Sequence, residues 1–198
     1  VTTKALTATA STANKVYDGT TTATTTLTFS GLIGSETLGQ TVGSTFNNKN
    51  VGTGKTVTVN SITLTDGTGL AANYSISPGQ TSTANIIVKT LTATASTANK
   101  VYDATNSATT TLTLSGLIGT ETLTSSNTST FNNKNVGTGK TVTVNSITLT
   151  DGTGLAANYS ISPGQTTTAD VTAKTLIATA STANKVYDST TLANTTLT

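Results

Sequence analysis

The chain has 198 residues, a net charge of +2 and only 9% charged residues, a balance that gives no electrostatic footprint for nucleic acid or a membrane surface. It contains no cysteine and no histidine, so disulfides are excluded and the commonest metal ligand and proton shuttle are missing. No apolar run approaches the length of a membrane-spanning helix. We therefore expect no enzymatic activity, no cofactor or metal, no nucleic-acid partner and no membrane insertion.

A tandem repeat organises the chain. Tyr17, Tyr102 and Tyr187 each lie in the string Lys-Val-Tyr-Asp, at a spacing of 85 residues (102 − 17 and 187 − 102). A unit of that size can close its own modest core, whereas solenoid repeats of about 20–45 residues borrow theirs from neighbours. The spacing therefore predicts a string of small domains. They are a first repeat over residues 1–88, a second over 89–173 and the start of a third over 174–198.

Each repeat is predicted to consist of β-strands, because apolar residues alternate with threonine. In the first repeat the alternation runs through residues 6–10, 27–29, 57–59 and 84–88. It slips by one residue after Val59, which predicts a bulge or strand break near Asn60 and Ser61. No stretch has a sustained helical period, although residues 70–74 suit a single helical turn. We expect an immunoglobulin-like sandwich first and a β-grasp-like sheet second.

The joint between the repeats is predicted to be short and stiff. Residues 86–88 pass through Lys89 and Thr90 directly into Leu91, with no Gly/Ser-rich or Pro-rich linker. The repeats should therefore form an elongated, monomeric rod in which each repeat needs only its neighbour in the same chain. Because an isolated strand pair is marginal in water, we expect residues 174–198 to pack on the second domain.

Two motifs that resemble chemical sites are better explained by structure. The string Gly-Thr-Gly-Lys-Thr at residues 52–56 lacks the first glycine of a phosphate-binding loop, since that position is Lys49. A strand follows it instead of a helix, so we interpret it as a glycine-rich hairpin turn. The string Asp-Gly-Thr-Gly at residues 66–69 supplies one carboxylate, where calcium usually takes several, and we interpret it as a turn.

Two further alternatives follow from the composition. An internal isopeptide bond between a lysine and an asparagine, helped by Glu36 or Asp18, would suit a cysteine-free chain, with Lys15, Lys49 and Lys55 as candidates. We favour the simpler interpretation that these lysines are solvated or cap loops. The Thr-x-Thr strings raise ice binding as a remote alternative, but the slips in alternation break the flat array that an ice-binding face needs.

Four ordered motifs, at residues 15–21, 31–34, 49–55 and 72–74, resemble the YDG domain. That family is found in tandem in very large bacterial surface proteins, often filamentous-haemagglutinin-like adhesins, and it implies no catalytic residues. We expect each Tyr-Asp pair to form a structural corner, in which the ring packs under a loop and the carboxylate binds backbone N–H groups. Because Ala104 and Ser189 replace Gly19, we expect an ordinary backbone there. The corner residues are Tyr17, Asp18, Tyr102, Asp103, Tyr187 and Asp188.

The resemblance and the stiff joint together predict a secreted stalk or spacer of a bacterial adhesin. It would project a binding head from the cell surface, in the service of cell adhesion or biofilm formation. The alternative is that the repeats themselves bind glycan or host protein. Sugar sites usually need exposed aromatic rings, however, and the five tyrosines and three phenylalanines recur at positions that look like core.

Overall fold

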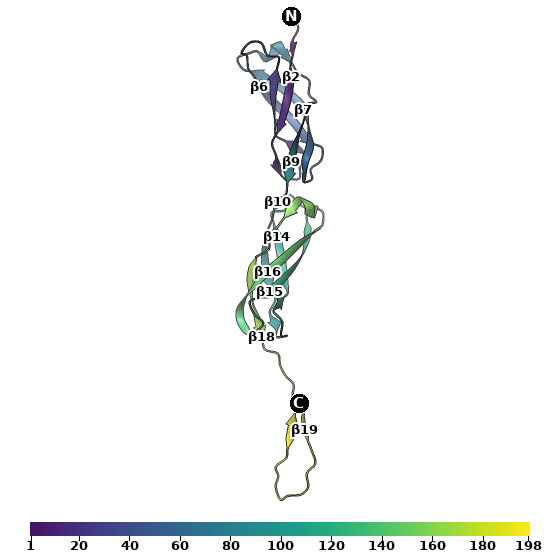
Figure 1. The fold of residues 1–198 in the computed structure, drawn as a ribbon, viewed down its shortest axis with the longest axis vertical. Helices are drawn as coiled ribbons and strands as arrows, with labels where there is room; N and C mark the ends of the chain where they lie inside the picture. The colour runs from purple at the N-terminus through teal and green to yellow at the C-terminus, as the bar shows by residue number, and fades with distance from the viewer.

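A computed structural model describes residues 1–198 as two β domains in line, followed by a separate hairpin (Figure 1). This confirms the predicted all-β architecture of small tandem domains. The choice between an immunoglobulin-like sandwich and a β-grasp-like sheet stays a prediction. The only helices are single 3-10 turns, and none could cross a membrane.

The two repeats contain the same elements in the same order. Those of the first repeat are β1 (Lys4–Ala5), β2 (Thr7–Thr12), β3 (Lys15–Val16), β4 (Thr22–Ala23), β5 (Thr25–Ser30), β6 (Leu38–Phe46), β7 (Gly52–Asp66), the 3-10 helix η1 (Ala71–Asn73), β8 (Tyr74–Ser75) and β9 (Thr81–Ile87). Those of the second repeat are β10 (Lys89–Thr90), β11 (Thr92–Thr97), β12 (Lys100–Val101), β13 (Ser107–Ala108), β14 (Thr110–Ser115), β15 (Leu123–Phe131), β16 (Gly137–Asp151), η2 (Ala156–Asn158), β17 (Tyr159–Ser160) and β18 (Thr166–Thr172).

Each repeat has one large sheet and two small ones. In the first repeat the large sheet has the order β3-β9-β7-β6-β4, with β3 parallel to β9 and the other neighbours antiparallel. Strands β2 and β5 form an antiparallel pair, and β1 pairs with β8 in parallel. One face of the large sheet contributes buried apolar side chains to the core, among them Phe46, Val57, Val59 and Ile86.

Hydroxyl groups join the small sheet to the large one. Thr25 Oγ1 on β5 lies 2.7 Å from Thr12 Oγ1 on β2 and 2.7 Å from Ser44 Oγ on β6. Thr12 Oγ1 also lies 2.6 Å from Ser82 Oγ on β9. Because each hydroxyl both donates and accepts, the chain of hydroxyls satisfies itself without charge. A threonine-rich sequence can therefore close a core with few large apolar side chains.

The bulge predicted near Asn60 and Ser61 is confirmed. Gly43 lies opposite Ser61, but the next residue of β6, Ser44, lies opposite Val59. Asn60 is therefore the extra residue, and its Nδ2 donates a hydrogen bond to Thr45 Oγ1 at 2.9 Å. One inserted residue restores the alternation, so that β7 continues through the slip as a single strand.

The glycine-rich string at residues 52–56 is not the hairpin turn that we predicted. It lies inside β7, where the pairing with β9 shifts between Gly52 and Lys55. Gly54 has φ +58°, which glycine adopts without strain, and this local kink produces a bulge in place of a chain reversal. The Lys55 side chain turns inward, where its Nζ donates a hydrogen bond to Asn48 Oδ1 at 2.6 Å.

The helical turn expected at residues 70–74 is present as η1. Asp66 Oδ1 accepts a hydrogen bond from the Ala71 N–H at 2.7 Å and so holds the loop that leads into the turn. This gives the carboxylate a structural role. The structure contains no group of three or more acidic, histidine or cysteine side chains that could hold a metal ion.

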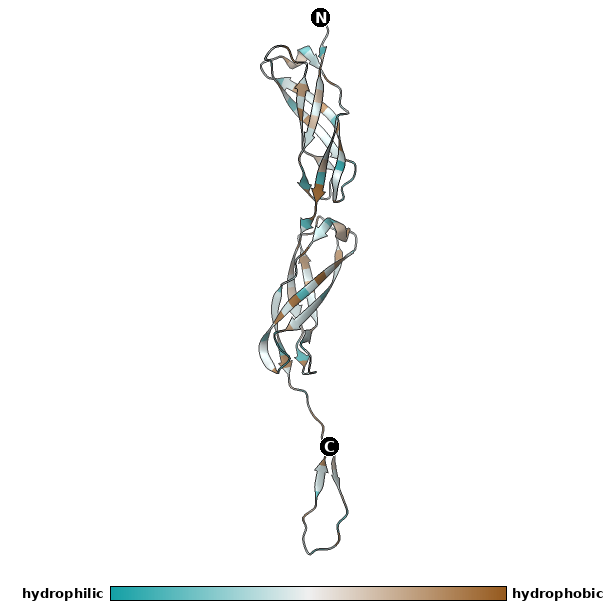
Figure 2. Cartoon of the chain, viewed as in Figure 1, coloured by the Kyte–Doolittle hydropathy of each residue, from teal (hydrophilic) through white to brown (hydrophobic).

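Residues 174–198 do not pack on the second domain, so our expectation for this segment was wrong. Strands β19 (Ala180–Thr182) and β20 (Thr195–Leu197) pair only with each other, and every residue of this segment is exposed. The corresponding hairpin β2–β5 is covered by β6 and β9 of its own repeat, and residues 174–198 include no equivalents of those strands. Figure 2 shows the contrast, with hydrophobic strands in both domains and a pale terminal hairpin.

Candidate functional site: the joint between the repeats

The chain crosses from one repeat to the next through one residue. Strand β9 ends at Ile87 and β10 begins at Lys89, so only Val88 lies between them. This matches the short joint expected from the sequence. A tether of that length keeps the end of the first repeat in contact with the beginning of the second, where two sets of side chains meet.

The Lys-Val-Tyr-Asp corner is held by hydrogen bonds within its own repeat. Lys15 Nζ donates to Asp18 Oδ1 at 2.7 Å and to the carbonyl oxygens of Thr20 and Thr22, both at 2.9 Å. Asp18 Oδ1 also accepts from the Thr20 N–H at 2.9 Å, which is the backbone contact expected of this carboxylate. The same Lys–Asp ion pair forms in the second repeat and in the lone hairpin, so the corner does not depend on a neighbouring domain.

The backbone at this corner is left-handed, which contradicts our expectation of an ordinary conformation. Gly19 has φ +77°, and its equivalents Ala104 and Ser189 have φ +68° and +64°. A side chain in this region costs about 1–2 kcal/mol. Ala104 and Ser189 are tolerated at this position because the hydrogen bonds of the lysine and the aspartate hold the turn whichever residue stands there.

The Tyr17 ring packs under a loop, as expected, but the loop belongs to the next repeat. Its phenol donates a hydrogen bond to Glu121 Oε1 at 2.7 Å, in the loop between β14 and β15. Its ring meets that of Tyr159 edge to face, with the centroids 5.4 Å apart. Only 1% of Tyr17 is exposed. We call this side chain the plug and its binding site the socket, formed by Ile118, Glu121, Asn158 and Tyr159.

Glu121 is the centre of the socket. Its Oε2 accepts a hydrogen bond from the Tyr159 phenol at 2.6 Å, and its Oε1 lies 3.4 Å from Lys49 Nζ of the first repeat. Burial raises the pKa of Tyr17 to about 12, and the neighbouring Glu121 carboxylate adds to this effect. Burial also disfavours the Glu121 carboxylate, but hydrogen bonds from Tyr159, Tyr17 and Lys49 outweigh it and lower the Glu121 pKa.

A second contact lies beside the plug. Asn158 Oδ1 accepts a hydrogen bond from the Val51 N–H at 2.9 Å, and Asn158 Nδ2 donates to Asn50 Oδ1 at 3.2 Å. Only 2% of Asn158 is exposed. Both partners come from the loop between β6 and β7, so a second loop of the first repeat is fixed to the socket.

Apolar packing continues through the joint. Tyr17, Phe46 and Ile86 of the first repeat form one buried cluster with Leu91 and Tyr159 of the second. The two repeats therefore share part of a core instead of touching only at the surface. The joint combines this shared core with a charged hydrogen bond and a buried amide, and each of the three fixes the orientation of the neighbouring domain.

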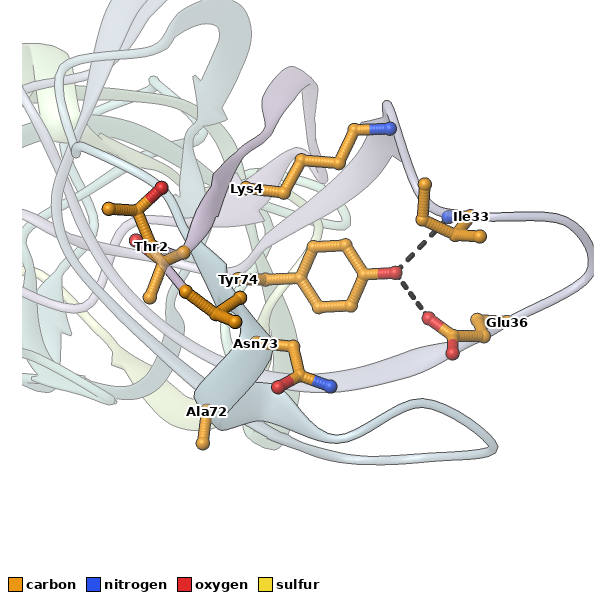
Figure 3. Close-up of a pocket in the computed structure, with 9 residues that line it drawn as sticks. Thr2, Lys4, Ile33, Glu36, Ala72, Asn73 and Tyr74 are labelled. Atoms are coloured by element: carbon orange, nitrogen blue, oxygen red, sulfur yellow. Dashed lines mark hydrogen bonds between the residues drawn. The ribbon is translucent and has the colours of Figure 1, made fainter.

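The first repeat carries the same socket at its far end, where it is open. Tyr74 donates a hydrogen bond to Glu36 and accepts one from the Ile33 N–H at 3.1 Å (Figure 3). These side chains border a cavity of about 420 Å³. Asn73, the equivalent of Asn158, is exposed there, and Glu36 has no hydrogen-bond donor other than Tyr74.

The free plugs lie at the other end of the molecule. Tyr102 is partly exposed and its phenol makes no hydrogen bond, although its corner has the same Lys–Asp pair as the first. Tyr187 in the terminal hairpin is 89% exposed. The Lys100 ion pair and the Thr105 hydrogen bonds lower the pKa of Asp103 to about 2.

The three lysines considered for an isopeptide bond have separate partners. Lys15 binds Asp18 and backbone carbonyls, Lys49 binds Glu121, and Lys55 binds Asn48. An amide and a carboxylate therefore do not meet at the Nζ atom of any of the three. In the structure each ammonium group holds a turn or the joint, and the choice between this role and an isopeptide bond stays a prediction that intact mass spectrometry tests.

Sequence reasoning missed the socket, although a signal for it was present. Glu36 and Glu121, like Asn73 and Asn158, stand at the same place in both repeats, whereas residues 39–43 and 124–128 differ between them. Recurrence of the carboxylate close to this variable stretch indicates a contact that both repeats need. Nothing in one repeat alone shows that this contact lies in its neighbour.

Comparison with known proteins supports the repeat assignment. The YDG domain matches twice, over residues 2–84 and residues 87–169. No curated protein and no solved structure gives a significant match to the chain. The two matched segments meet at the joint described above and together cover most of the 198 residues. The chain therefore belongs to the YDG domain family, as two tandem repeats joined by a plug and a socket.

Proposed function

We propose that this chain is a structural stalk segment of a bacterial cell-surface adhesin, with no catalytic role of its own. The observation that carries the proposal is the burial of Tyr17 in the socket of the next repeat, with its phenol on Glu121. A contact of this kind sets the direction of one domain relative to the next. Repeats joined in this way add length without adding flexibility.

Three features of the joint support a stiff connection. The tether is one residue long, so the domains cannot separate. The plug comes from the corner after β3, whereas the Asn158 contact and the Lys49–Glu121 pair both come from the loop between β6 and β7, so two separate loops of the first repeat hold the second domain. A hydrogen bond to a charged group contributes about 1.5–3 kcal/mol, enough to keep the joint mostly closed.

The arrangement also suits a protein that bears load. The long strands run roughly along the axis of the molecule, and each repeat is entered and left at opposite ends (Figure 1). A pulling force would therefore act along hydrogen-bonded strands. Secretion, a cell-surface location and a role in cell adhesion or biofilms rest on the resemblance to repeats of large surface adhesins.

Small-angle scattering on a chain that ends at residue 173 tests the stalk, because residues 174–198 pack on neither domain and would blur the measured length. We expect a single narrow distribution of lengths for the wild type and a broader, shorter one for Glu121→Gln, which removes the charge that the plug binds. Glu36→Gln, the same change in the open socket, is the matched control and should leave the distribution unchanged. A broad distribution in the wild type would mean flexible beads. Reproducible hits on a glycan array would instead favour repeats that bind ligands themselves.

A further inference from the structure

One side chain closes the edge of β5 in the first repeat. Strand β5 pairs with β2 on one side only, and the Gln40 amide on β6 binds its other side. Gln40 Oε1 accepts a hydrogen bond from the Leu27 N–H at 3.1 Å, and Gln40 Nε2 donates one to the Leu27 carbonyl oxygen at 2.7 Å. A primary amide can make both bonds because its carbonyl group and one of its N–H groups point the same way.

The second repeat lacks this closure. Ser125 stands where the first repeat has Gln40. The nearest amide, that of Asn127, donates to the Thr110 carbonyl oxygen at 2.9 Å, which lies two residues before Leu112 on β14. No side-chain hydrogen bond reaches the backbone of Leu112, and this leucine is partly exposed, whereas its equivalent in the first repeat is buried.

The backbone groups of Leu112 point to the free edge of β14. Successive residues of an antiparallel strand direct their N–H and C=O groups to opposite sides. The Thr109 carbonyl oxygen accepts from the Ala98 N–H at 3.4 Å, at the end of the β11–β14 pair. Thr109 therefore faces β11, and Thr110 and Leu112 do not alternate in phase with it. One donor and one acceptor of Leu112 thus lie together at an edge that no strand covers.

This edge borders an apolar cleft between β14 and β15. The cleft has a volume of about 450 Å³, within the usual range for sites that bind small ligands. Such sites combine an apolar lining with a few polar groups that fix the orientation of the ligand. The cleft lies within the second repeat, away from both ends of the chain. Its apolar lining consists of Leu112, Leu114, Leu117 and Leu123.

We propose that the cleft binds the side-chain amide of a glutamine in an extended segment of a partner protein. The amide accepts from the Leu112 N–H and donates to the Leu112 carbonyl oxygen, as Gln40 does in the first repeat. A single peptide unit or acetamido group can make only one of these bonds, because the N–H and C=O of a trans amide point in opposite directions. Apolar residues two positions before and after the glutamine would contact the leucines, since they share its face as Leu38 and Val42 share that of Gln40.

A short peptide with this pattern tests the site. The peptide Leu-Thr-Gln-Thr-Val, acetylated and N-methylamidated so that it contains no other primary amide, is titrated into the isotope-labelled full chain. We expect saturable NMR shifts at Leu112, Leu114 and Ser125, with a Kd on the order of 1 mM. The same peptide with glutamate in place of glutamine lacks the donor and should bind at least about tenfold more weakly.

Exchanging one residue between the repeats gives matched variants. Ser125→Gln supplies the amide from within the second repeat and should abolish the shifts at Leu112. Gln40→Ser frees the equivalent backbone groups in the first repeat and should add shifts at Leu27. Each variant takes the residue with which the other repeat already folds, so both should retain the fold.

Three results would overturn the proposal. The first is the absence of shifts at Leu112 in the wild type. The second is equal binding of the glutamate peptide, which would mean that backbone pairing and not the amide carries the contact. The third is binding that persists at Leu112 in Ser125→Gln. None of them would bear on the stalk, because the joint uses Tyr17 and Glu121, which all these chains retain.

Discussion

The filled socket of the second repeat and the open socket of the first contain the same residues in different surroundings. Asn158 is 2% exposed and holds two groups of the first repeat, whereas Asn73 is exposed at the end of the molecule. Tyr17 is buried, whereas Tyr102 is partly exposed. The difference arises entirely from the neighbouring domain. The functional unit is therefore the end of one repeat together with the beginning of the next.

The largest difference between the two ends is expected at the plug. Tyr17→Ala removes a buried ring and its bond to Glu121, and should cost about 3–5 kcal/mol of unfolding free energy. Tyr102→Ala removes a partly exposed ring that makes no hydrogen bond but packs against the core of its own repeat, and should cost less, about 1–2 kcal/mol. Urea denaturation of both variants measures the two costs. Equal costs would mean that each tyrosine belongs to the core of its own repeat and that the plug has no special role.

The buried amide gives the next largest contrast. Asn158→Ala leaves the Val51 N–H without its acceptor, which should destabilise the joint by about 1–3 kcal/mol. Asn73→Ala changes an exposed residue and should be neutral within about 0.5 kcal/mol. Hydrogen exchange at the Val51 amide reports the effect directly, since that proton should exchange faster in Asn158→Ala only. Unchanged protection in that variant would show that the amide does not fasten the joint.

The joint should open at both extremes of pH. The folded pKa of Tyr17, about 12, lies above its ordinary value of 10.0, so its contribution is complete below pH 10 and is lost as the pH rises toward 12. Glu121 has a lowered pKa, so its contribution is complete above its ordinary value of 4.5 and is lost as the pH falls through the folded pKa. At either extreme of pH the joint should lose about 1.5 kcal/mol of stability, the contribution of one hydrogen bond to a charged group.

Residual dipolar couplings of the two domains measure this opening, because they report a common alignment only while the joint is rigid. Tyr17→Phe removes one of the two phenols that donate to Glu121, and Tyr159, whose pKa is also raised by burial, remains. The alkaline change should therefore be smaller in Tyr17→Phe than in the wild type, while the acid change is retained. An alkaline change of equal size in both proteins would mean that Tyr159 or another group controls the joint.

The local features of this molecule could be predicted from the sequence, and the contacts between repeats could not. The strands, the bulge at Asn60 and the one-residue joint are all local patterns of alternation or composition. Tyr17 and Glu121 are 104 residues apart, and no periodicity within one repeat connects them. The conformation of Gly19 was missed because the cost of a left-handed alanine was weighed without the lysine and aspartate bonds that hold the corner.

That corner gives the smallest and most specific contrast. Ala104→Gly relieves a left-handed alanine in an undocked corner and should stabilise the second repeat by about 1 kcal/mol. Gly19→Ala should cost more than this gain, because its new methyl group would lie 2.9 Å from Ile118 in the filled socket. Ile118→Ala removes that clash. In its presence Gly19→Ala should cost only the free energy of placing an alanine in the left-handed backbone conformation. Ile33→Ala, the same change in the open socket, should leave the cost of Gly19→Ala unchanged. A cost that Ile118→Ala does not lower would show that the first corner is not pressed against the second repeat.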